Sequence, residues 1–415
     1  MKLVVFAHTP PPHHGQSYMV QMMLTGFVAD HQKQNSVQCY HVNCRLSDDI
    51  ASVGNYRPRK IFKLLLYCIK AVWFRFRYKV ETLYYVPAPA KKSAIFRDWI
   101  VMMLVRPWFK KTIFHWHALG LGHWTEQKIE YPMKHNSFDL KPPQIFGKLD
   151  FLARIFTARL MAEADLSIVL TQYNRNDAEL LKPKKTCVIC NGIPDPCPEF
   201  ETTILHERQQ RLQQRKQALY INPIKTPEVV YFRCLFLAHC TELKGLFDAL
   251  EAVATANKRL ADKKLTMRIS LSVAGEFISI QERKRFDKVA LAINKQHLAV
   301  RDQKLVKYYG FVSGIEKDAL LRKNDCLIFP TRYPNEAQPV TMIEAMAYGM
   351  PVVASNWRGI GETLPHEAAT SLDFSSSLLD TALLEVFSQL RYSYKENHSV
   401  DSHIKLLQKA IHALN

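Results

Sequence analysis

Two glutamates, Glu336 and Glu344, lie eight positions apart in the stretch NEAQPVTMIEAMAYGMPVVAS, residues 335–355. The preceding CLIFP predicts a strand, so Glu336 falls in the loop at its carboxyl end and Glu344 in a helix that ends at Gly349. Ligands of open α/β sheets bind at the carboxyl ends of strands, and amides at a helix start can hold phosphate. A carboxylate repels a phosphate, so the two glutamates are expected to accept hydrogen bonds from hydroxyls of the same ligand. Sugar and ribose hydroxyls meet that need.

The phosphate contact is expected at the start of this helix. Pro339 has no N–H, so the amides of Val340 and Thr341 are the predicted donors. A second set of polar residues lies in LAHCTELKG, where His239 and Lys244 follow a predicted strand. Lys244 can stabilise negative charge, whereas His239 either bonds a phosphate oxygen or packs against its neighbours.

The pair His115 and His117 raises the question of a metal. No second cluster at ligand spacing accompanies the pair, so no metal is expected. Nine cysteines are scattered along the chain, and Cys187, Cys190 and Cys197, which lie near one another, lack histidine partners at zinc spacing; this favours a reducing, cytoplasmic compartment. Neither a signal peptide nor a spanning helix is expected from the pattern of apolar runs.

The elements that must position these residues form two series. Short β-rich runs alternate with helical patterns up to residue 197, and a second series begins at VVYFRCLFLAH and closes with PVVAS. This alternation is typical of parallel α/β sheets, and 415 residues suffice for two cores. Two Rossmann-like domains are predicted. The first domain is expected at 1–198 and the second at 228–388, with a polar connector at 199–227 between them. A tail of about 389–415 is expected to pack back on the first domain.

Charge is placed unevenly over these divisions. Residues 1–227 carry +15 of the total +18, whereas residues 228–388 carry +1. Such asymmetry suggests that the first half faces an anionic partner, either nucleic acid or a membrane surface.

Residues 56–80 hold eight basic residues and no acidic one. Apolar residues recur there at helical spacing, with Lys60, Lys63, Lys70 and Arg77 opposite them, which predicts a basic amphipathic helix. Such a helix can lie on an anionic membrane, or can pack against its own sheet.

Several motifs occur in one order along the chain. They are VICNGIPD (188–195), FLAHCTELKG (236–245), SVAGE (272–276), YYGFVS (308–313), the Glu336–Glu344 pair with EAMAYGMPVVAS and, more loosely, TPPPHHGQS (9–17). Together they resemble retaining glycosyltransferases of family 4, in the superfamily of glycogen synthase and phosphatidylinositol mannosyltransferase. The resemblance implies the GT-B fold, an α/β architecture of two Rossmann-like domains whose parallel sheets face each other across a cleft.

The resemblance also implies roles for individual residues. It places Glu336 on the donor sugar, Glu344 on the ribose and Lys244 on the diphosphate, with His239 where an arginine is common. His117, rather than His115, is expected to approach the donor sugar from the first domain. Further donor contacts are expected from the loops that hold Gly15, Phe311 and Gln338, and from Val340 and Thr341.

The implied reaction is transfer of a sugar, with retention, from a nucleotide-diphosphate sugar to a hydroxyl of a glycan or lipid-linked acceptor in cell-surface polysaccharide or glycolipid synthesis. No cofactor or metal is expected. The protein is expected in the cytoplasm, with contact to an anionic membrane surface through residues 56–80. Two alternatives are another GT-B nucleotide-sugar enzyme, such as an epimerase, and a basic nucleic-acid-binding protein; no nucleic-acid-binding motif supports the latter.

Overall fold

The computed structural model describes residues 1–11, 15–29, 36–46, 58–126, 145–220, 229–265, 267–298, 304–365 and 379–414. The chain forms two compact units. Unit 1 comprises residues 1–192, 334–338 and 400–415, and unit 2 comprises residues 193–333 and 339–399.

Unit 1 is built on a parallel sheet of six strands in the order β2-β1-β3-β4-β5-β6. Its strands are β1 (Lys2–Ala7), β2 (Gln38–Asn43), β3 (Thr82–Tyr85), β4 (Lys111–His115), β5 (Leu166–Val169) and β6 (Thr186–Val188). Its helices are α1 (Gly15–Ala29), α2 (Pro58–Arg77), α3 (Lys92–Leu104), α4 (Leu121–Glu126), α5 (Asp150–Met161), α6 (Gln172–Glu179) and α13 (Val400–His412), with the short turns η2 (Arg106–Trp108) and η3 (Gly147–Leu149).

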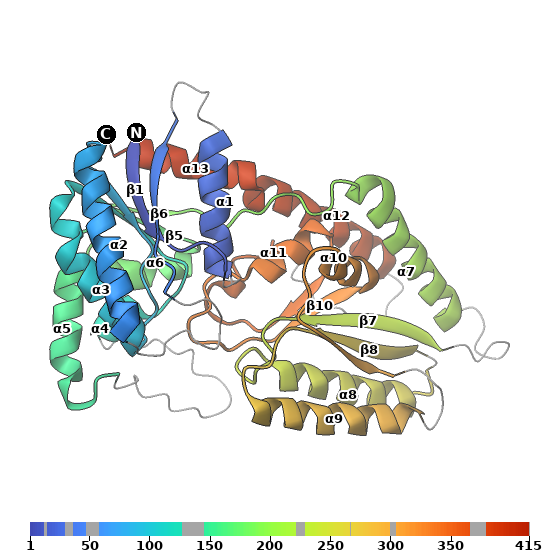
Figure 1. The fold of residues 1–415 in the computed structure, drawn as a ribbon. Coiled ribbons are helices and arrows are strands. Elements are labelled where there is room, and N and C mark those ends of the chain that lie inside the picture. The colour runs from blue at the N-terminus through green and yellow to red at the C-terminus, as the bar shows by residue number, and fades with distance from the viewer. Residues whose placement is uncertain are drawn as a thin grey trace. The chain divides into compact units, whose positions relative to one another are not determined.

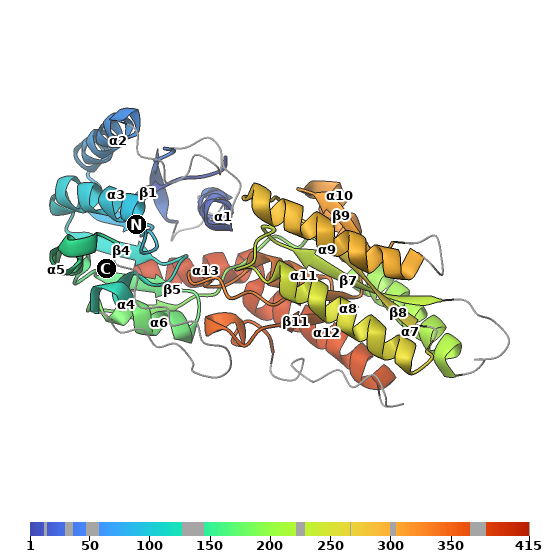
Figure 2. The same cartoon turned by 90° about the horizontal axis from the view of Figure 1, so that it is seen from below.

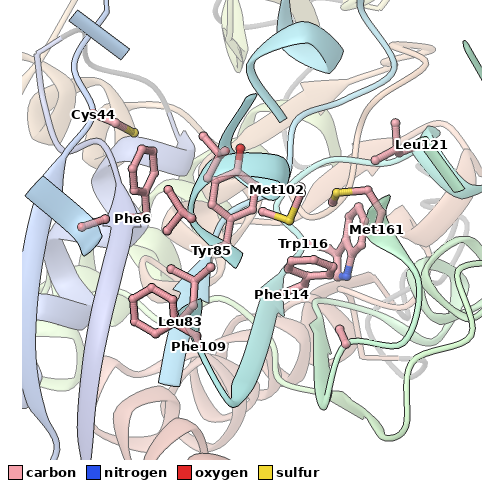
Figure 3. Packing of buried hydrophobic residues seen from close by; sticks show 14 of the residues in the cluster. Phe6, Cys44, Leu83, Tyr85, Met102, Phe109, Phe114, Trp116, Leu121 and Met161 are labelled. Carbon is pink, nitrogen blue, oxygen red and sulfur yellow. The ribbon is translucent and has the colours of Figure 1, made fainter. Parts of the chain in front are cut away.

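Successive residues of each strand in unit 1 point to opposite faces, and both faces are apolar. Val4 and Phe6 of β1 join a core that α2, α3 and α5 cover, whereas Leu3 and Val5 join a core that α1 and α13 cover. Figure 3 shows the first of these cores, in which Phe6, Cys44, Leu83, Tyr85, Met102, Phe109, Phe114, Trp116, Leu121 and Met161 pack together.

Unit 2 is built on a parallel sheet of five strands in the order β11-β10-β7-β8-β9. Its strands are β7 (Val230–Leu237), β8 (Met267–Ala274), β9 (Val306–Gly310), β10 (Cys326–Phe329) and β11 (Val352–Ala354). Its helices are η4 (Phe200–Ile204), α7 (Leu205–Tyr220), α8 (Leu246–Asp262), α9 (Ile280–Leu298), α10 (Gly314–Lys323), α11 (Val340–Ala347), η5 (Arg358–Ile360) and α12 (Leu379–His398).

Two layers of helices cover the second sheet as well. Helices α8 and α9 pack on one face, and α10, α11 and α12 pack on the other (Figure 1). The helix predicted from VTMIEAMAYG is α11, and Gly349 follows it with φ +57°. The α/β fold of two parallel sheets is thus as predicted.

The segment 199–227, expected to be a polar connector, contains helix α7, which is part of unit 2. The reason lies in its arginines: the buried Arg208 donates to the carbonyls of Leu321, Asn324 and Tyr348, at 3.1, 3.0 and 3.0 Å. Polar composition therefore does not indicate a linker here, because buried guanidinium groups satisfy backbone acceptors at the ends of two other elements.

The C-terminal tail is divided at residue 400 rather than at about 389. Residues 389–398 belong to α12 in unit 2, and α13 packs on the first sheet through Ile404, Leu407 and Ile411. At the division, the amide of Ile193 donates to the carbonyl of His398 at 2.9 Å.

Candidate active site

The order of strands in unit 2 creates a switch point between β7 and β10. From β7 the chain proceeds to β8 and β9 on one side, and then crosses to β10 and β11 on the other. The loops that leave the carboxyl ends of β7 and β10 therefore diverge, and the space between them is the usual ligand site of a doubly wound sheet.

Two glycines allow the loops at this edge to approach one another closely. Gly245 has φ +81°, and a Cβ on it would lie 2.2 Å from the carbonyl oxygen of Pro330. Gly275 has φ +144°, and its Cβ would lie 1.8 Å from the carbonyl oxygen of Ala238. The loops after β7, β8 and β10 thus pack backbone against backbone, which only glycine permits at these positions.

Lys244 reaches the carboxyl end of β10. Its ammonium lies 5.7 Å from the ring centre of Phe329, the last residue of β10, and 4.7 Å from that of Tyr333 in the following loop. Aromatic faces attract a cation, so they orient Lys244 towards the switch point. The structure therefore brings the predicted lysine to the loop that leads into α11.

His239 lies in the same loop as Lys244 and is half-buried. Burial, and then the positive charge of Lys244, lower the pKa of His239 below its usual 6.5. The imidazole is therefore neutral at pH 7 and provides a hydrogen bond rather than a second cation.

Helix α11 follows the loop that leaves the carboxyl end of β10. Its first-turn bond is donated by the amide of Met342 to the carbonyl of Pro339 at 3.1 Å, so the amides of Val340 and Thr341 precede the hydrogen-bonded turns. One turn further on, Glu344 accepts a hydrogen bond from Lys317 of α10 at 2.5 Å. A cation that the sequence did not suggest thus stands beside the predicted ribose ligand.

The other predicted glutamate belongs to unit 1. Glu336 is buried, with 8% of its surface exposed, in the segment 334–338 that forms part of that unit. Its neighbour Ala337 packs with Leu119 and Leu170. The two glutamates, eight positions apart in the sequence, therefore belong to different structural units.

Gln338 fixes this segment to unit 1. Its side-chain oxygen accepts from the amide of Asn191 at 2.6 Å, and its carbonyl accepts from Asn191 Nδ2 at 3.2 Å. Among the described residues no partner is recorded for the buried Nε2 of Gln338. The side chain thus positions the segment and retains one donor group.

Of the two histidines at the end of β4, His115 is buried and His117 is half-exposed. The Tyr84 hydroxyl hydrogen-bonds to His115 Nδ1, and burial together with the neighbouring His117 and His403 holds the pKa of His115 well below its usual value. The ring centre of His115 lies 4.1 Å from that of His117 and 6.2 Å from that of His403. His115 is therefore a neutral core histidine, and His117 is the more accessible of the two.

Asp177 of α6 holds the loop that carries His117. Its carboxylate accepts from the amides of Gly120 and His123 at 2.8 and 2.7 Å, and from His123 Nδ1 at 2.6 Å. A buried carboxylate that binds several backbone amides fixes a loop firmly.

The remaining predicted contacts lie in loops at strand ends. Gly15 begins α1 after β1, and its neighbours 12–14 lie outside the described residues. Phe311 follows β9 and is 54% exposed. In the described part of the chain no three residues of the types His, Cys, Asp and Glu form a cluster suited to a metal ion.

Comparison with known proteins identifies the second unit. Residues 226–376 match the family described as glycosyl transferases group 1. No curated protein matches the sequence. The chain is a glycosyltransferase. This agrees with the first of the three classes predicted from the sequence.

Solved structures show that the glycosyltransferase has the GT-B fold. It is similar over 100% of its length to sucrose-phosphate synthase from Thermosynechococcus elongatus, with TM-score 0.61, 13% identity and 99% of that chain covered. An alpha,alpha-trehalose-phosphate synthase (UDP-forming) from Burkholderia vietnamiensis gives TM-score 0.58 and 11% identity, with 100% of this chain and 96% of that one covered. A glycosyltransferase from Rickettsia africae ESF-5 gives TM-score 0.56 and 12% identity, with 100% of this chain and 98% of that one covered.

Sequence reasoning missed Lys317, Asp177 and Asn191. Each acts through a partner that is distant in the sequence, so no local spacing marks it. The polar pair Asn191 and Gln338, for example, is 147 positions apart. Gly275 lies in the motif SVAGE, which gave a signal for the loop but not for the close approach to Ala238.

We expect Gly245→Ala to destabilise the glycosyltransferase by about 3 kcal/mol, because a left-handed φ and a steric overlap with Pro330 both oppose the new methyl group. Gly310→Ala is the matched control: Gly310 has φ +74° but nothing within 4 Å of its Cβ position. That variant is expected to lose only about 1 kcal/mol. Denaturant unfolding measures both, and equal losses would contradict a close approach at Gly245.

Proposed function

We propose that this glycosyltransferase transfers a sugar from a nucleotide-diphosphate sugar to a hydroxyl acceptor, with retention at the anomeric carbon. The observation that carries the proposal is the position of Lys244, whose ammonium lies at the carboxyl end of β10 beside the loop that leads into α11. This is the switch point of a domain that matches glycosyl transferases group 1. A diphosphate there meets a cation and helix amides together.

The proposed reaction breaks the bond between the anomeric carbon and a diphosphate oxygen. The electron pair leaves with the diphosphate, and the acceptor oxygen forms the new glycosidic bond while its hydroxyl proton passes to an oxygen of the departing diphosphate. Negative charge grows on the leaving group, so Lys244 and the amides of Val340 and Thr341 stabilise the transition state. Neutral His239 donates a hydrogen bond to a phosphate oxygen.

Glu344 is proposed to accept hydrogen bonds from the ribose hydroxyls. Its ion pair with Lys317 supports this role, because the ammonium fixes the direction of the carboxylate before a nucleotide arrives. Phe311, exposed in the loop before α10, is proposed to contact the base. Since the Burkholderia relative is named as UDP-forming, UDP is the first nucleotide to test.

Unit 1 is proposed to supply the contacts to the donor sugar. Glu336 accepts from a sugar hydroxyl, and Gln338 Nε2 donates to the sugar. His117 approaches the sugar from the loop that Asp177 anchors. Gly15, at the start of α1, allows backbone to approach the donor phosphate and the acceptor.

The acceptor is proposed to be a glycan or a lipid-linked molecule used in cell-surface polysaccharide or glycolipid synthesis. The +15 charge of residues 1–227 and the basic helix within 56–80 support attachment of a cytoplasmic protein to an anionic membrane surface. In the described part of the chain, every helix is too short or too polar to cross a bilayer.

The proposed ribose contact is tested by Glu344→Ala. Loss of a charged hydrogen-bond acceptor is expected to raise the nucleotide Kd about tenfold or more, read as a smaller rise in melting temperature with UDP or GDP. Combining the change with Lys317→Met removes the effect of an unmatched ammonium. Glu316→Ala, which removes an exposed acid from α10, is the control. An unchanged nucleotide response in both Glu344 variants would contradict the contact.

The proposed charge stabilisation is tested by Lys244→Ala. Removing the cation is expected to slow transfer by about 2–4 kcal/mol in activation free energy. Nucleotide release from a panel of nucleotide sugars, with and without acceptor, measures the rate. Lys258→Ala, which removes an exposed lysine from α8, serves as control. Wild-type turnover in the Lys244 variant would refute its role.

The reaction is proposed to need no metal ion, since Lys244 and the helix amides supply the charge stabilisation. Activity is therefore expected to survive treatment with EDTA, measured as nucleotide release. Loss of activity that Mg²⁺ or Mn²⁺ restores would show that a metal is required.

A further inference from the structure

Three neighbouring helices of unit 1, α2, α3 and α5, turn apolar side chains to solvent as well as to the core. Figures 1 and 2 both place these helices together over one side of the first sheet. Their exposed apolar residues, with those of the adjoining turns η2 and η3, are here named the three-helix face: Phe62, Leu65, Leu66, Ile69, Trp73, Phe76, Met103, Leu104, Trp108, Leu149, Phe151, Leu152, Ile155 and Phe156.

Helix α2 is apolar on two opposite sides. Leu64, Cys68 and Ala71 are buried against the sheet. The residues at 62, 66, 69, 73 and 76 recur every three or four positions and form a second stripe, with exposures from 48% for Leu66 to 65% for Ile69. The periodicity in the sequence predicted one apolar side, with basic residues opposite it. The structure corrects this expectation, because the stripe divides between the core and solvent.

Basic residues follow one border of the exposed stripe. Arg59, Lys63, Lys70 and Arg77 are spaced by four or seven positions, which places them along a single line on α2. Lys70 and Arg77 are exposed, and their ammonium and guanidinium groups lie 5.4 Å from the ring centres of Phe74 and Tyr78. Long cationic side chains so placed can cover apolar surface and reach an anionic layer above it.

Helix α5 repeats this arrangement. Ala153, Thr157 and Met161 are buried beneath it. On the other side Phe151 and Leu152, each 62% exposed, follow the exposed Leu149 of η3. A short helix rarely exposes several large apolar residues unless something covers them.

Aromatic contacts join the helices into one surface. Phe76 of α2 packs edge-on against Trp108 of η2, with ring centres 5.6 Å apart. Trp99 of α3 packs in the same manner against Phe156 of α5, at 5.1 Å. The exposed side chains therefore belong to a continuous face rather than to isolated positions.

The charge around the face is strongly positive. Residues 58–110 and 145–161 contain fifteen lysines and arginines but only three acidic residues. Each acid pairs with a base: Glu81 with Lys110 at 2.6 Å, Asp98 with Arg97 at 2.9 Å, and Asp150 with Arg154 at 3.1 Å. Lysines and arginines therefore outnumber the acidic residues of these segments, and the net charge around the face is positive.

We propose that the three-helix face inserts into the boundary between headgroups and acyl chains of an anionic bilayer, with α5 as a second anchor beside α2. Apolar side chains with tryptophans and a basic border match that boundary. A second copy of the chain would bring two cationic borders together, which disfavours self-association. This inference extends the proposed membrane contact of 56–80, and adds insertion to electrostatic attraction.

Vesicle sedimentation tests the proposal with phosphatidylglycerol–phosphatidylcholine and pure phosphatidylcholine vesicles at low and high salt. The α5 variant Phe151→Ser/Leu152→Ser is expected to bind anionic vesicles at least about tenfold more weakly than wild type, because two inserted side chains are lost. Salt is expected to weaken wild-type binding without abolishing it, since insertion does not depend on charge. The control, Ile280→Ser/Leu291→Ser, removes two exposed apolar residues from α9 of unit 2 and is expected to bind as wild type.

A charge variant, Lys63→Gln/Lys70→Gln/Arg77→Gln, separates the two contributions: it is expected to lose the preference for anionic vesicles while α5 remains intact. Equal binding by wild type and the α5 variant, or no binding by wild type, would overturn the proposal. A dimer in solution that the α5 variant abolishes would instead assign the face to a second copy. Stabilisation by nucleotide is measured on every variant. Its absence from wild type would count against the proposed function and leave the vesicle result independent.

Discussion

The close approach of loops at the carboxyl edge of the second sheet is the constraint on which the proposed donor site depends. Gly245 meets Pro330, and Gly275 meets Ala238, with no room for a side chain between the backbones. This contact sets where the loop after β7 ends and therefore where Lys244 points. The aromatic rings of Phe329 and Tyr333 then hold the ammonium at the end of β10. A cation placed in this way requires little reorganisation when a diphosphate develops charge.

Ionic groups in this protein are positioned by partners that are far away in the sequence. Lys317 reaches Glu344 from a different helix, and Asp177 holds the loop of His117 through two amides and an imidazole. Arg208 satisfies three carbonyls from the interior of unit 2. A charged group that is removed from water needs hydrogen-bond partners. The partners of these groups therefore fix the loops and helices that carry the charges.

Unit 1 combines a buried core with an outer apolar surface on the same three helices. Leu64 and Ile69 of α2 illustrate the difference: one is buried against the sheet and the other is 65% exposed. The cost of exposing such residues in water is offset once a lipid boundary covers them. The same helices would thus stabilise the fold through their buried side and attach the protein to a membrane through their exposed side.

The sequence by itself determined the α/β class and the two series of strands, and it predicted the residues of the proposed donor motif. Alternation and motif order depend on neighbours along the chain, so they can be read without coordinates. It also predicted α11 with its following Gly349, because a strand, a loop and a helix start have local signals.

Tertiary structure alone decided how these parts combine. It placed Glu336 in unit 1 and Glu344 in unit 2, made α7 part of the second unit, and buried His115 while leaving His117 half-exposed. It also decided which apolar side of α2 faces the sheet. Helical periodicity shows that residues share a side, but only packing against a partner shows which side is covered, and the partners here lie far away in the sequence.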